Sequence, residues 1–304
     1  MRCLIWGGKG WLWVDCISGL LQAVAILIFW NSRMCRFWRV SCGLVWMRRM
    51  SDLARWLPFY RQRPNERLWL FCFPHAGGGA SLYRGWQEVL PPEVGVCAVQ
   101  WPGRETRIEE RPFTSLDELI EAWLDVFTPW LKRPFAFFGH SLGALIAFEL
   151  ARSIRRKTGH TPALFIASGF RAPQLPSSLP RICHLPDAAF LHELSHLGSL
   201  PQAVWDTPEL IELLLPALRA DFTIYEQYQY QPSSELPLPC PVYAWGGLGD
   251  KLVSFEELDG WREQAWDAFA VRLFPGGHFY LQESRSYILP ALAHLLAECV
   301  AQFI

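Results

Sequence analysis

A serine stands between two glycines at residues 139–143, which read Gly-His-Ser-Leu-Gly and fit the pattern G-x-S-x-G. The apolar run 135–138 precedes this segment and predicts a buried strand, and residues 144–152 predict a helix. A strand, a tight turn and a helix in this order would expose the Ser141 hydroxyl at a sheet edge, where it can act as a nucleophile. The glycines lack Cβ atoms, so neighbouring backbone can approach the turn. The alternative is a loop serine without a catalytic role.

A serine nucleophile needs a base, and the base needs a carboxylate that orients it. Among the eight histidines, His278 follows the last predicted strand behind two glycines, at the edge where Ser141 emerges. We therefore expect His278 to be the base. Asp250 follows the preceding predicted strand and is the expected carboxylate, which gives the order Ser141, Asp250, His278 that is typical of α/β-hydrolases. Asp187 and Asp221 are weaker candidates for the carboxylate.

Attack on a carbonyl carbon creates an oxyanion, which backbone N–H groups can stabilise. One expected donor is Leu142, the residue after the nucleophile. The other is Ala76, in the glycine-rich segment 75–79 that follows the predicted strand at 68–73. A glycine-rich loop could bind phosphate instead, but neither a dinucleotide-binding pattern nor a Walker lysine is present.

Residues 192–196 read His-Glu-Leu-Ser-His and fit H-E-x-x-H, a pattern typical of zinc proteases. No third ligand is clearly marked downstream of it. We expect a solvated helix face here, and neither a metal nor another cofactor.

Strands and helices alternate along most of the chain, which predicts an α/β fold with a mostly parallel sheet flanked by helices. The expected strands are 68–73, 94–99, 135–138, 162–168, 241–245 and 270–274. Ser115 and Glu118 form a predicted capping box at the start of a helix over 115–131. Residues 104–111 are expected to be a charged loop, and 284–303 a helix interrupted by Pro290.

Between the expected strands at 162–168 and 241–245, about 70 residues do not show the alternation of strands and helices. Short helices are expected at 187–196, 207–215 and 216–230. Because such an insertion at the carboxyl edge of a parallel sheet is placed to cover a site, we interpret residues 171–236 as a helical lid.

The charge balance argues against a nucleic-acid partner. The 304-residue chain has a formal net charge of −1. Residues 1–50 contain seven basic residues and one acidic residue, whereas 51–304 contain 21 basic and 28 acidic residues. The nine cysteines form no C-x-x-C pair, so we expect reduced thiols and a cytoplasmic protein.

Residues 1–50 differ in composition from the rest, and we expect the enzyme domain to comprise 51–304. The apolar run 17–30 is shorter than the roughly 20 residues of a membrane span, and no clear signal-peptide cleavage site follows it. The extension is therefore interpreted either as an artefact, with Met50 as the true start, or as a membrane-associating anchor. A folded part of the domain is a third alternative.

Taken together, the motifs resemble the stand-alone, or type II, thioesterases of nonribosomal peptide and polyketide synthesis. The matching stretches are 73–78 (Phe-Pro-His-Ala-Gly-Gly), 102–107 (Pro-Gly-Arg-Glu-Thr-Arg), 138–143 (Phe-Gly-His-Ser-Leu-Gly), 215–222 (Leu-Pro-Ala-Leu-Arg-Ala-Asp-Phe) and 274–279 (Phe-Pro-Gly-Gly-His-Phe). Leu142 stands where methionine is common, the lid near Gly198 lacks a usual second glycine, and residues 1–50 have no counterpart.

The resemblance implies an α/β-hydrolase fold and a triad of Ser141, Asp250 and His278. It also implies hydrolysis of acyl or aminoacyl thioesters from the phosphopantetheine arms of carrier proteins, which clears misprimed groups from a synthase. Carrier protein domains are thus the expected partners, and we expect the enzyme to be a monomer. Alternatives are a small-molecule carboxylesterase or lipase of the same fold, a synthase-terminal thioesterase, and an inactive binding module.

Overall fold

The computed structural model describes residues 2–7, 10–15, 52–197, 202–232 and 237–303, which belong to two units, Met1–Met50 and Ser51–Ile304. In the first unit, strands β1 (Arg2–Gly7) and β2 (Gly10–Asp15) pair antiparallel. This hairpin was not predicted. The apolar run 17–30 lies outside the described residues, and none of the described helices has the length and apolar character to span a bilayer.

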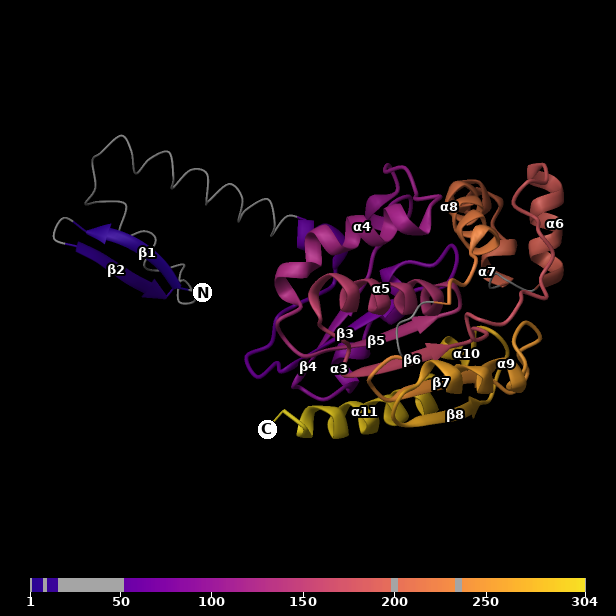
Figure 1. The fold of residues 1–304 in the computed structure, drawn as a ribbon. Helices are drawn as coiled ribbons and strands as arrows, with labels where there is room; N and C mark the ends of the chain where they lie inside the picture. Colours follow the sequence, from indigo (N-terminus) through magenta and orange to yellow (C-terminus); the bar gives the residue numbers. More distant parts are fainter. Residues whose placement is uncertain (1, 8–9, 16–51, 198–201, 233–236, 304) are drawn as a thin grey trace. The chain divides into compact units, whose positions relative to one another are not determined.

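The second unit is built on a six-stranded sheet of order β4-β3-β5-β6-β7-β8, in which every neighbouring pair is parallel (Figure 1). The strands are β3 (Leu68–Phe73), β4 (Val94–Ala98), β5 (Phe135–His140), β6 (Leu164–Ser168), β7 (Val242–Gly247) and β8 (Phe269–Phe274). All six predicted strands are therefore present, with small shifts at their ends.

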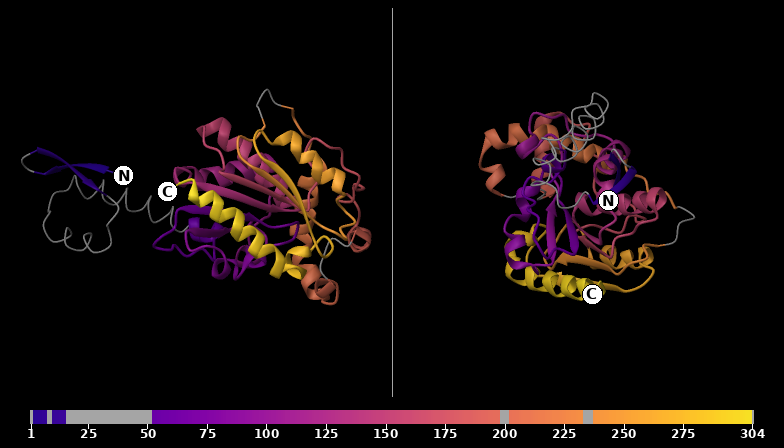
Figure 2. Two further views of the ribbon diagram at one scale, coloured as in Figure 1. Left: turned by 90° about the horizontal axis from the view of Figure 1, so that it is seen from below. Right: turned by 90° about the vertical axis from the view of Figure 1, so that its left-hand side faces the viewer.

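Helices cover both faces of this sheet (Figures 1 and 2). Helices α4 (Leu116–Phe127) and α5 (Leu142–Thr158) pack on one face, and α3 (Trp86–Val89) and α11 (Arg285–Ala301) on the other. Strand β3 is buried throughout, and its alternate residues enter opposite cores, as Phe71 and Leu70 do. Burial on both faces explains why this strand is a continuous apolar run in the sequence.

Large aromatic side chains fill the core beneath α4. Trp123 stacks on Phe127 with ring centroids 4.4 Å apart, and Phe71 meets Trp123 edge to face at 5.3 Å. Burying each such ring stabilises the fold by about 1.5–3 kcal/mol. This core holds the strands on which the candidate site is built.

The ends of the sheet-covering helices follow the predicted signals in part. The Ser115 hydroxyl accepts a hydrogen bond from the Glu118 N–H, as expected of an N-cap. The expected interruption at Pro290 is wrong, because α11 continues through this residue. An interior proline lacks an N–H donor and crowds a carbonyl of the preceding turn, but the buried neighbours Leu289 and Leu292 hold the helix against the sheet.

The predicted lid contains α6 (Asp187–Leu197), α7 (Gln202–Trp205) and α8 (Pro208–Gln227). The two short helices expected on either side of Pro216 are one helix, α8, because buried residues such as Leu218 and Phe222 continue its apolar face beyond the proline. Phe222 meets Phe190 of α6 edge to face at 5.7 Å. Figure 1 shows these helices on the side to which the strands point.

Short helical segments complete the second unit. They are η1 (Ala80–Tyr83), η2 (Glu105–Arg107), η3 (Thr128–Trp130), α9 (Phe255–Asp259), η4 (Gly260–Gln264) and α10 (Tyr280–Glu283). Several of them lie in the loops that follow β3, β4, β7 and β8, and these loops surround the candidate site.

Candidate active site

Ser141 lies at a strained turn between β5 and α5. Its backbone angles are φ 53° and ψ −126°, a conformation that costs a residue other than glycine of order 1–3 kcal/mol. A Cβ atom on Gly143 would lie 2.2 Å from the carbonyl oxygen of Phe73, and one on Gly139 would lie 2.4 Å from Cα of Ala144. The close backbone approach expected at both glycines is therefore present.

The structure brings the three expected triad residues together. His278 Nδ1 lies 2.9 Å from Asp250 Oδ2, and His278 Nε2 lies 3.0 Å from Ser141 Oγ. The side chain of Asp250 is almost completely buried, and its Oδ1 accepts the Leu252 N–H at 2.8 Å. With Nδ1–H donating to the carboxylate, Nε2 keeps a lone pair that can accept the Ser141 proton. The arrangement is that of a nucleophile, a base and an orienting carboxylate.

The two weaker carboxylate candidates lie away from this group. Asp187 is exposed on α6 and pairs with Arg219 of α8. Asp221, on α8, forms a buried ion pair with Arg104. Neither carboxylate bonds His278 in the described part of the chain.

Two further histidines surround the base. Burial lowers the pKa of His140 well below its ordinary value, and His140 Nδ1 lies 2.9 Å from the Ser168 hydroxyl, not near Ser141 Oγ. Burial also lowers the pKa of His75 to about 4. Both rings are therefore neutral at pH 7, and they place no positive charge beside His278.

Two backbone donors lie at the pocket that Ser141 lines. Ala76 and Leu142 both line this pocket, and neither N–H bonds a protein acceptor within the described ranges. Leu142 is the first residue of α5, where N–H groups have no partner within the helix and the helix dipole favours negative charge. Both residues expected to supply the oxyanion donors thus line the pocket.

Apolar side chains from the lid and from the loops after β6, β7 and β8 form most of the remaining wall. They are Phe170, Leu179, Leu197, Phe222, Tyr225, Leu252, Val253 and Phe279. A pocket of this composition favours an apolar organic group next to Ser141.

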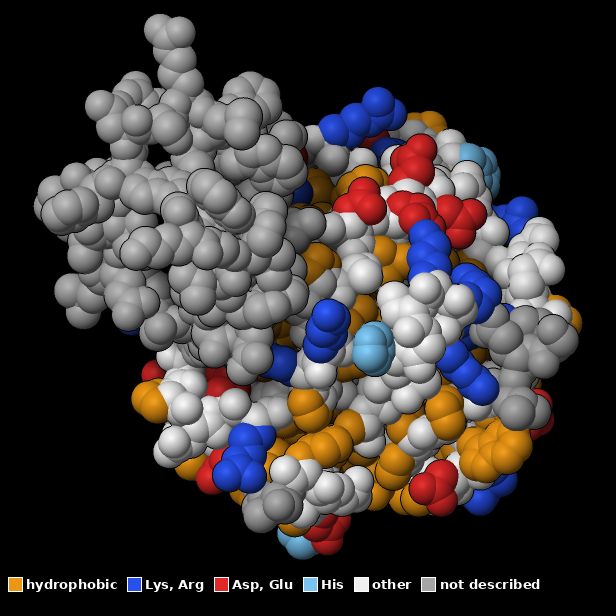
Figure 3. Space-filling model, turned by 60° about the vertical axis from the view of Figure 1, so that its left-hand side comes forward, with side chains coloured by type: hydrophobic (Ala, Val, Ile, Leu, Met, Phe, Trp, Pro, Cys, Tyr) orange, Lys and Arg blue, Asp and Glu red, His pale blue; other side chains and the backbone are white. Residues whose placement is uncertain are grey.

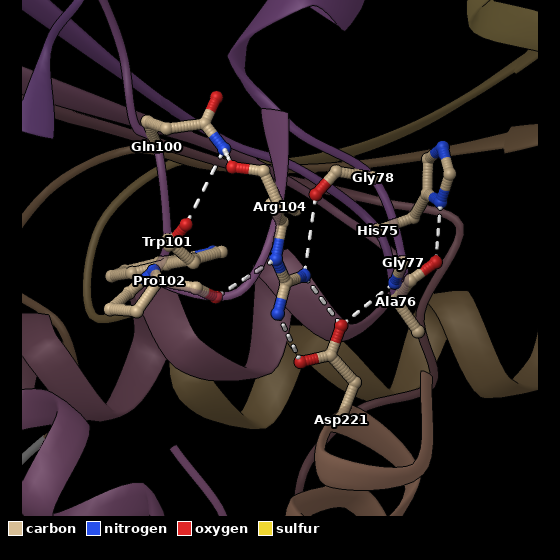
Figure 4. A network of polar contacts seen from close by, with 9 residues as sticks. All are labelled: His75, Ala76, Gly77, Gly78, Gln100, Trp101, Pro102, Arg104 and Asp221. Carbon is tan, nitrogen blue, oxygen red and sulfur yellow. Dashed lines mark hydrogen bonds and ion pairs between the residues drawn. The ribbon is translucent and has the colours of Figure 1, made fainter. Parts of the chain in front are cut away.

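A buried polar network lies behind the glycine-rich loop, where the sequence predicted only a charged loop (Figure 4). Arg104 is 2% exposed, and its guanidinium meets the Asp221 carboxylate with two contacts, of 2.6 and 2.9 Å. Asp221 Oδ2 also accepts the Gly77 N–H at 2.7 Å. This pairing was not predicted from the sequence, although an arginine and an aspartate stand in two of the motif stretches.

The H-E-x-x-H residues lie on α6 in the lid. His192 and His196 contact each other through their Nε2 atoms at 3.1 Å, and both are exposed. Across the described residues, no three His, Cys, Asp or Glu side chains are grouped so that they could hold a metal ion.

Comparisons with known proteins agree with this fold. A family model described as "Thioesterase domain" matches residues 69–297. The gramicidin S biosynthesis protein GrsT of Aneurinibacillus migulanus is 42% identical over 236 residues, which are 78% of this chain and 91% of that protein.

Solved structures of thioesterases are similar as well. RedJ, a thioesterase from the prodiginine pathway of Streptomyces coelicolor, is 37% identical to this chain, with a TM-score of 0.69. The match covers 81% of this chain and 94% of the RedJ chain. BorB, a type II thioesterase from the borrelidin cluster, is 36% identical to this chain, with a TM-score of 0.70. The match covers 77% of this chain and 94% of the BorB chain. The resemblance to type II thioesterases is therefore confirmed. The chain's homologues are type II thioesterases of nonribosomal peptide and polyketide pathways. The chain belongs to the thioesterase family: it is a hydrolase of thioesters and has an α/β-hydrolase fold.

Proposed function

We propose that this thioesterase hydrolyses acyl or aminoacyl thioesters on the phosphopantetheine arms of carrier proteins, and thereby clears misprimed groups from a nonribosomal peptide or polyketide synthase. One observation carries the proposal: His278 bonds both Ser141 and Asp250 next to an apolar pocket that the lid helps to form. The similarity to GrsT, RedJ and BorB supports the substrate class.

In the first half of the reaction, Ser141 is the nucleophile. His278 Nε2 takes the hydroxyl proton while Oγ attacks the thioester carbon, and Asp250 stabilises the imidazolium that forms. The N–H groups of Ala76 and Leu142 bond the resulting oxyanion, where each donor contributes about 10²–10³ in rate. The C–S bond then breaks, and His278 returns the proton to the leaving thiol. This step leaves an acyl group on Ser141.

In the second half, water replaces the thiol. His278 takes a proton from a water molecule that attacks the acyl-serine carbon, and the same two N–H groups bond the second oxyanion. Collapse breaks the C–O bond to Ser141, whose oxygen recovers a proton from His278. The products are a free carboxylic acid and the unchanged enzyme.

Recognition of the carrier has to come from local surface features, because the enzyme domain carries no strong charge of one sign. Among the described atoms on the face drawn in Figure 3, basic and acidic side chains are mixed with apolar ones. An even mixture does not favour a nucleic-acid backbone, which needs a basic stripe. Binding energy from the carrier surface and the arm can position the thioester over Ser141.

We further propose that the enzyme acts as a cytoplasmic monomer. The described cysteines are free, and burial raises the pKa of several of their thiols, including Cys72 and Cys97, which suits a reducing compartment. Light scattering on the purified full chain at micromolar concentration tests the oligomeric state. A stable dimer mass would contradict this part of the proposal.

The proposed function is tested with one acyl group presented in three forms. The acyl group is loaded on a carrier protein, on free pantetheine and as a p-nitrophenyl ester, and kcat/KM is measured for each. We expect the carrier-bound thioester to be the best substrate, because truncated substrates lose remote binding energy. Ser141→Ala should abolish turnover of all three forms while leaving the circular dichroism spectrum unchanged.

Two results would count against the proposal. A p-nitrophenyl ester that is better than the carrier-bound form by about tenfold or more would make the chain a general carboxylesterase of the same fold. Activity of Ser141→Ala above about one hundredth of the wild-type rate would remove Ser141 as the nucleophile, because loss of a triad serine costs far more than that.

A further inference from the structure

The peptide group between Ala76 and Gly77 is held at both of its polar atoms. Its carbonyl oxygen lies 2.9 Å from Nδ1 of His75, and its N–H donates to Asp221 Oδ2 at 2.7 Å. Because the peptide group is planar, two such bonds on opposite sides fix its orientation. Ala76 is thereby held on its C-terminal side, while its own N–H belongs to the preceding peptide and bonds no described protein acceptor.

The Gly78–Gly79 peptide, two peptides further along the loop, is held by the partner of Asp221. Arg104 Nη1 donates to the Gly78 carbonyl oxygen at 3.3 Å and to Asp221 Oδ2 at 2.6 Å. Gly77 itself has φ 73°, a left-handed conformation that glycine adopts without a steric penalty. The Arg104–Asp221 pair thus contacts the loop at the Ala76–Gly77 and Gly78–Gly79 peptides (Figure 4).

The pair is well suited to hold a loop rigidly. The side chains of Arg104 and Asp221 are 3% and 7% exposed, and a guanidinium that meets a carboxylate with two parallel bonds has a fixed geometry. Gln100 is fully buried, and it accepts the Ala80 N–H and donates to the Arg104 carbonyl oxygen. These contacts tie the glycine-rich loop and the start of η1 to the loop after β4, through Arg104 and Gln100, and to helix α8, through Asp221.

We propose that Asp221 and Arg104 are positioning residues for the oxyanion hole, which act by orienting the Ala76–Gly77 peptide so that the Ala76 N–H points at the substrate oxyanion. This inference rests on the proposed roles of Ser141 and Ala76. Since Asp221 belongs to the lid helix α8, the alignment of the Ala76 donor depends on where α8 is seated. An open lid would carry Asp221 away from Gly77 and leave the oxyanion with one fewer aligned donor.

The test separates transition-state stabilisation from substrate binding. Asp221→Asn and Arg104→Gln are assayed for kcat and KM with the best wild-type substrate, ester or thioester. Affinity is also measured for a trifluoromethyl ketone, whose serine adduct places an oxyanion in the same hole. We expect kcat to fall about 10²–10³-fold, as for loss of an oxyanion donor, and the ketone to bind weaker by a similar factor. The dissociation constant of the substrate, measured on a Ser141→Ala background, should change less than about threefold, because ground-state binding is not affected.

Two control variants break ion pairs that do not contact the glycine-rich loop. Asp187→Asn removes the partner of Arg219, a neighbour of Asp221 on the same lid helix. Glu149→Gln breaks a largely buried pair with Arg152 on helix α5. Both should keep kcat and ketone affinity within about twofold of wild type, whatever they do to thermal stability.

A second variant covers the case in which Asp221→Asn does not fold. The double change Arg104→Met/Asp221→Leu removes both buried charges and can leave stability nearly unchanged, but it still removes the acceptor of the Gly77 N–H. We expect this variant to fold and to show the same loss of kcat and of ketone affinity. Arg104→Lys keeps the charge but not the two parallel bonds, and it should show an intermediate loss.

The proposal is overturned if the folded variants keep wild-type kcat and ketone affinity, or if substrate affinity falls while kcat does not. Those results would make the pair a purely structural element or a determinant of the pocket. Failure of the proposed function gives a different pattern, since Ser141→Ala would then remain active or small esters would be the best substrates. Because kcat and KM are measured with whichever substrate the wild type hydrolyses best, failure of this inference can be distinguished from failure of the proposed function.

Discussion

Ser141 Oγ and His278 Nε2 lie 3.0 Å apart, although 137 positions separate these residues in the chain. Ser141 follows β5 and His278 follows β8, and both strands run in the same direction in one sheet. Parallel strands bring their carboxyl ends to a common edge, so residues from distant loops meet there. The proposed catalytic group is therefore a product of the sheet topology.

Asp250→Asn should lower kcat by about 10³–10⁴-fold, because an amide in place of the carboxylate favours the wrong tautomer of His278. The measurement is steady-state hydrolysis of one thioester by the variant and by the wild type, at a temperature at which both proteins are folded. Asp187→Asn is the matched control, and it should be close to wild type. A mild effect of Asp250→Asn together with a severe effect of Asp187→Asn would show that the wrong carboxylate has been chosen.

Gly143→Ala should damage both stability and activity. Its Cβ would lie 2.2 Å from the Phe73 carbonyl oxygen, so β3 or the start of α5 must move, at a cost of about 1–3 kcal/mol. Displacement of Ser141 and Leu142 should lower kcat by about 10²-fold or more. Gly159→Ala, at the other end of α5, is the control for kcat: its φ of 73° strains an alanine, but a Cβ atom there meets no other atom within 4 Å. Wild-type kcat in Gly143→Ala would contradict the tight-turn argument.

His192→Ala/His196→Ala should leave kcat/KM within about twofold of wild type, and treatment with EDTA should do the same. The reason is that both side chains are exposed on α6 and neither lines the pocket, and changes at exposed positions are usually small in effect. Hydrolysis is measured before and after chelation and after addition of zinc. Activity that is lost and then restored by zinc would refute this prediction.

A chain that begins at Met50 should fold and should have the kcat/KM of the full-length protein. Within the described part of Ser51–Ile304, residues from Leu53 onward form a buried core on each face of the sheet. Thermal unfolding and thioester hydrolysis of the two lengths provide the comparison. An insoluble or inactive product would show that residues 1–50 complete the enzyme domain.

His75 should make the protein less stable in mild acid. Its pKa is about 4 in the folded protein against 6.5 for an ordinary histidine, so the unfolded chain binds more protons between these values. The stabilising contribution is fully present above pH 6.5 and is lost as pH falls toward 4, and the loss amounts to about 2 kcal/mol at pH 5. The groups that influence His75 are His278, Asp221 and Arg104.

Denaturant unfolding of wild type and His75→Asn at pH 7 and pH 5 measures this contribution. Asparagine can still donate a hydrogen bond, but it does not titrate in this range. The wild type should lose more stability than the variant between the two pH values. Equal losses would mean that His75 is not kept neutral by burial.

Local sequence signals determined much of the fold and of the site. The strands β3, β5 and β6 are buried over their whole length, because helices cover both faces of the sheet, and they are apolar except at the last residues of β5 and β6. Such apolar runs can be read without knowledge of the fold. Gly139 and Gly143 around Ser141 marked the tight turn, since only glycine permits that approach of backbone. Asp250 and His278 were predictable because each follows a strand, and strand ends in a parallel sheet share one edge.

Helix continuity was less predictable. Pro216 and Pro290 are strong local signals for a helix end, yet α8 and α11 continue through them. The deciding factor is the burial of side chains on either side of each proline, which depends on what the helix packs against. A local propensity is a weak prior against this tertiary contribution.

Only the tertiary structure decided what Arg104 and Asp221 do. The residues are 117 positions apart, and the sequence allowed Arg104 to be a loop charge and Asp221 to be a triad carboxylate. Docking of α8 against the glycine-rich loop buries both charges, and a buried charge is stable only when it is paired and hydrogen-bonded. That pairing, together with the Gly77 N–H that completes it, exists only once the lid and the sheet edge are assembled.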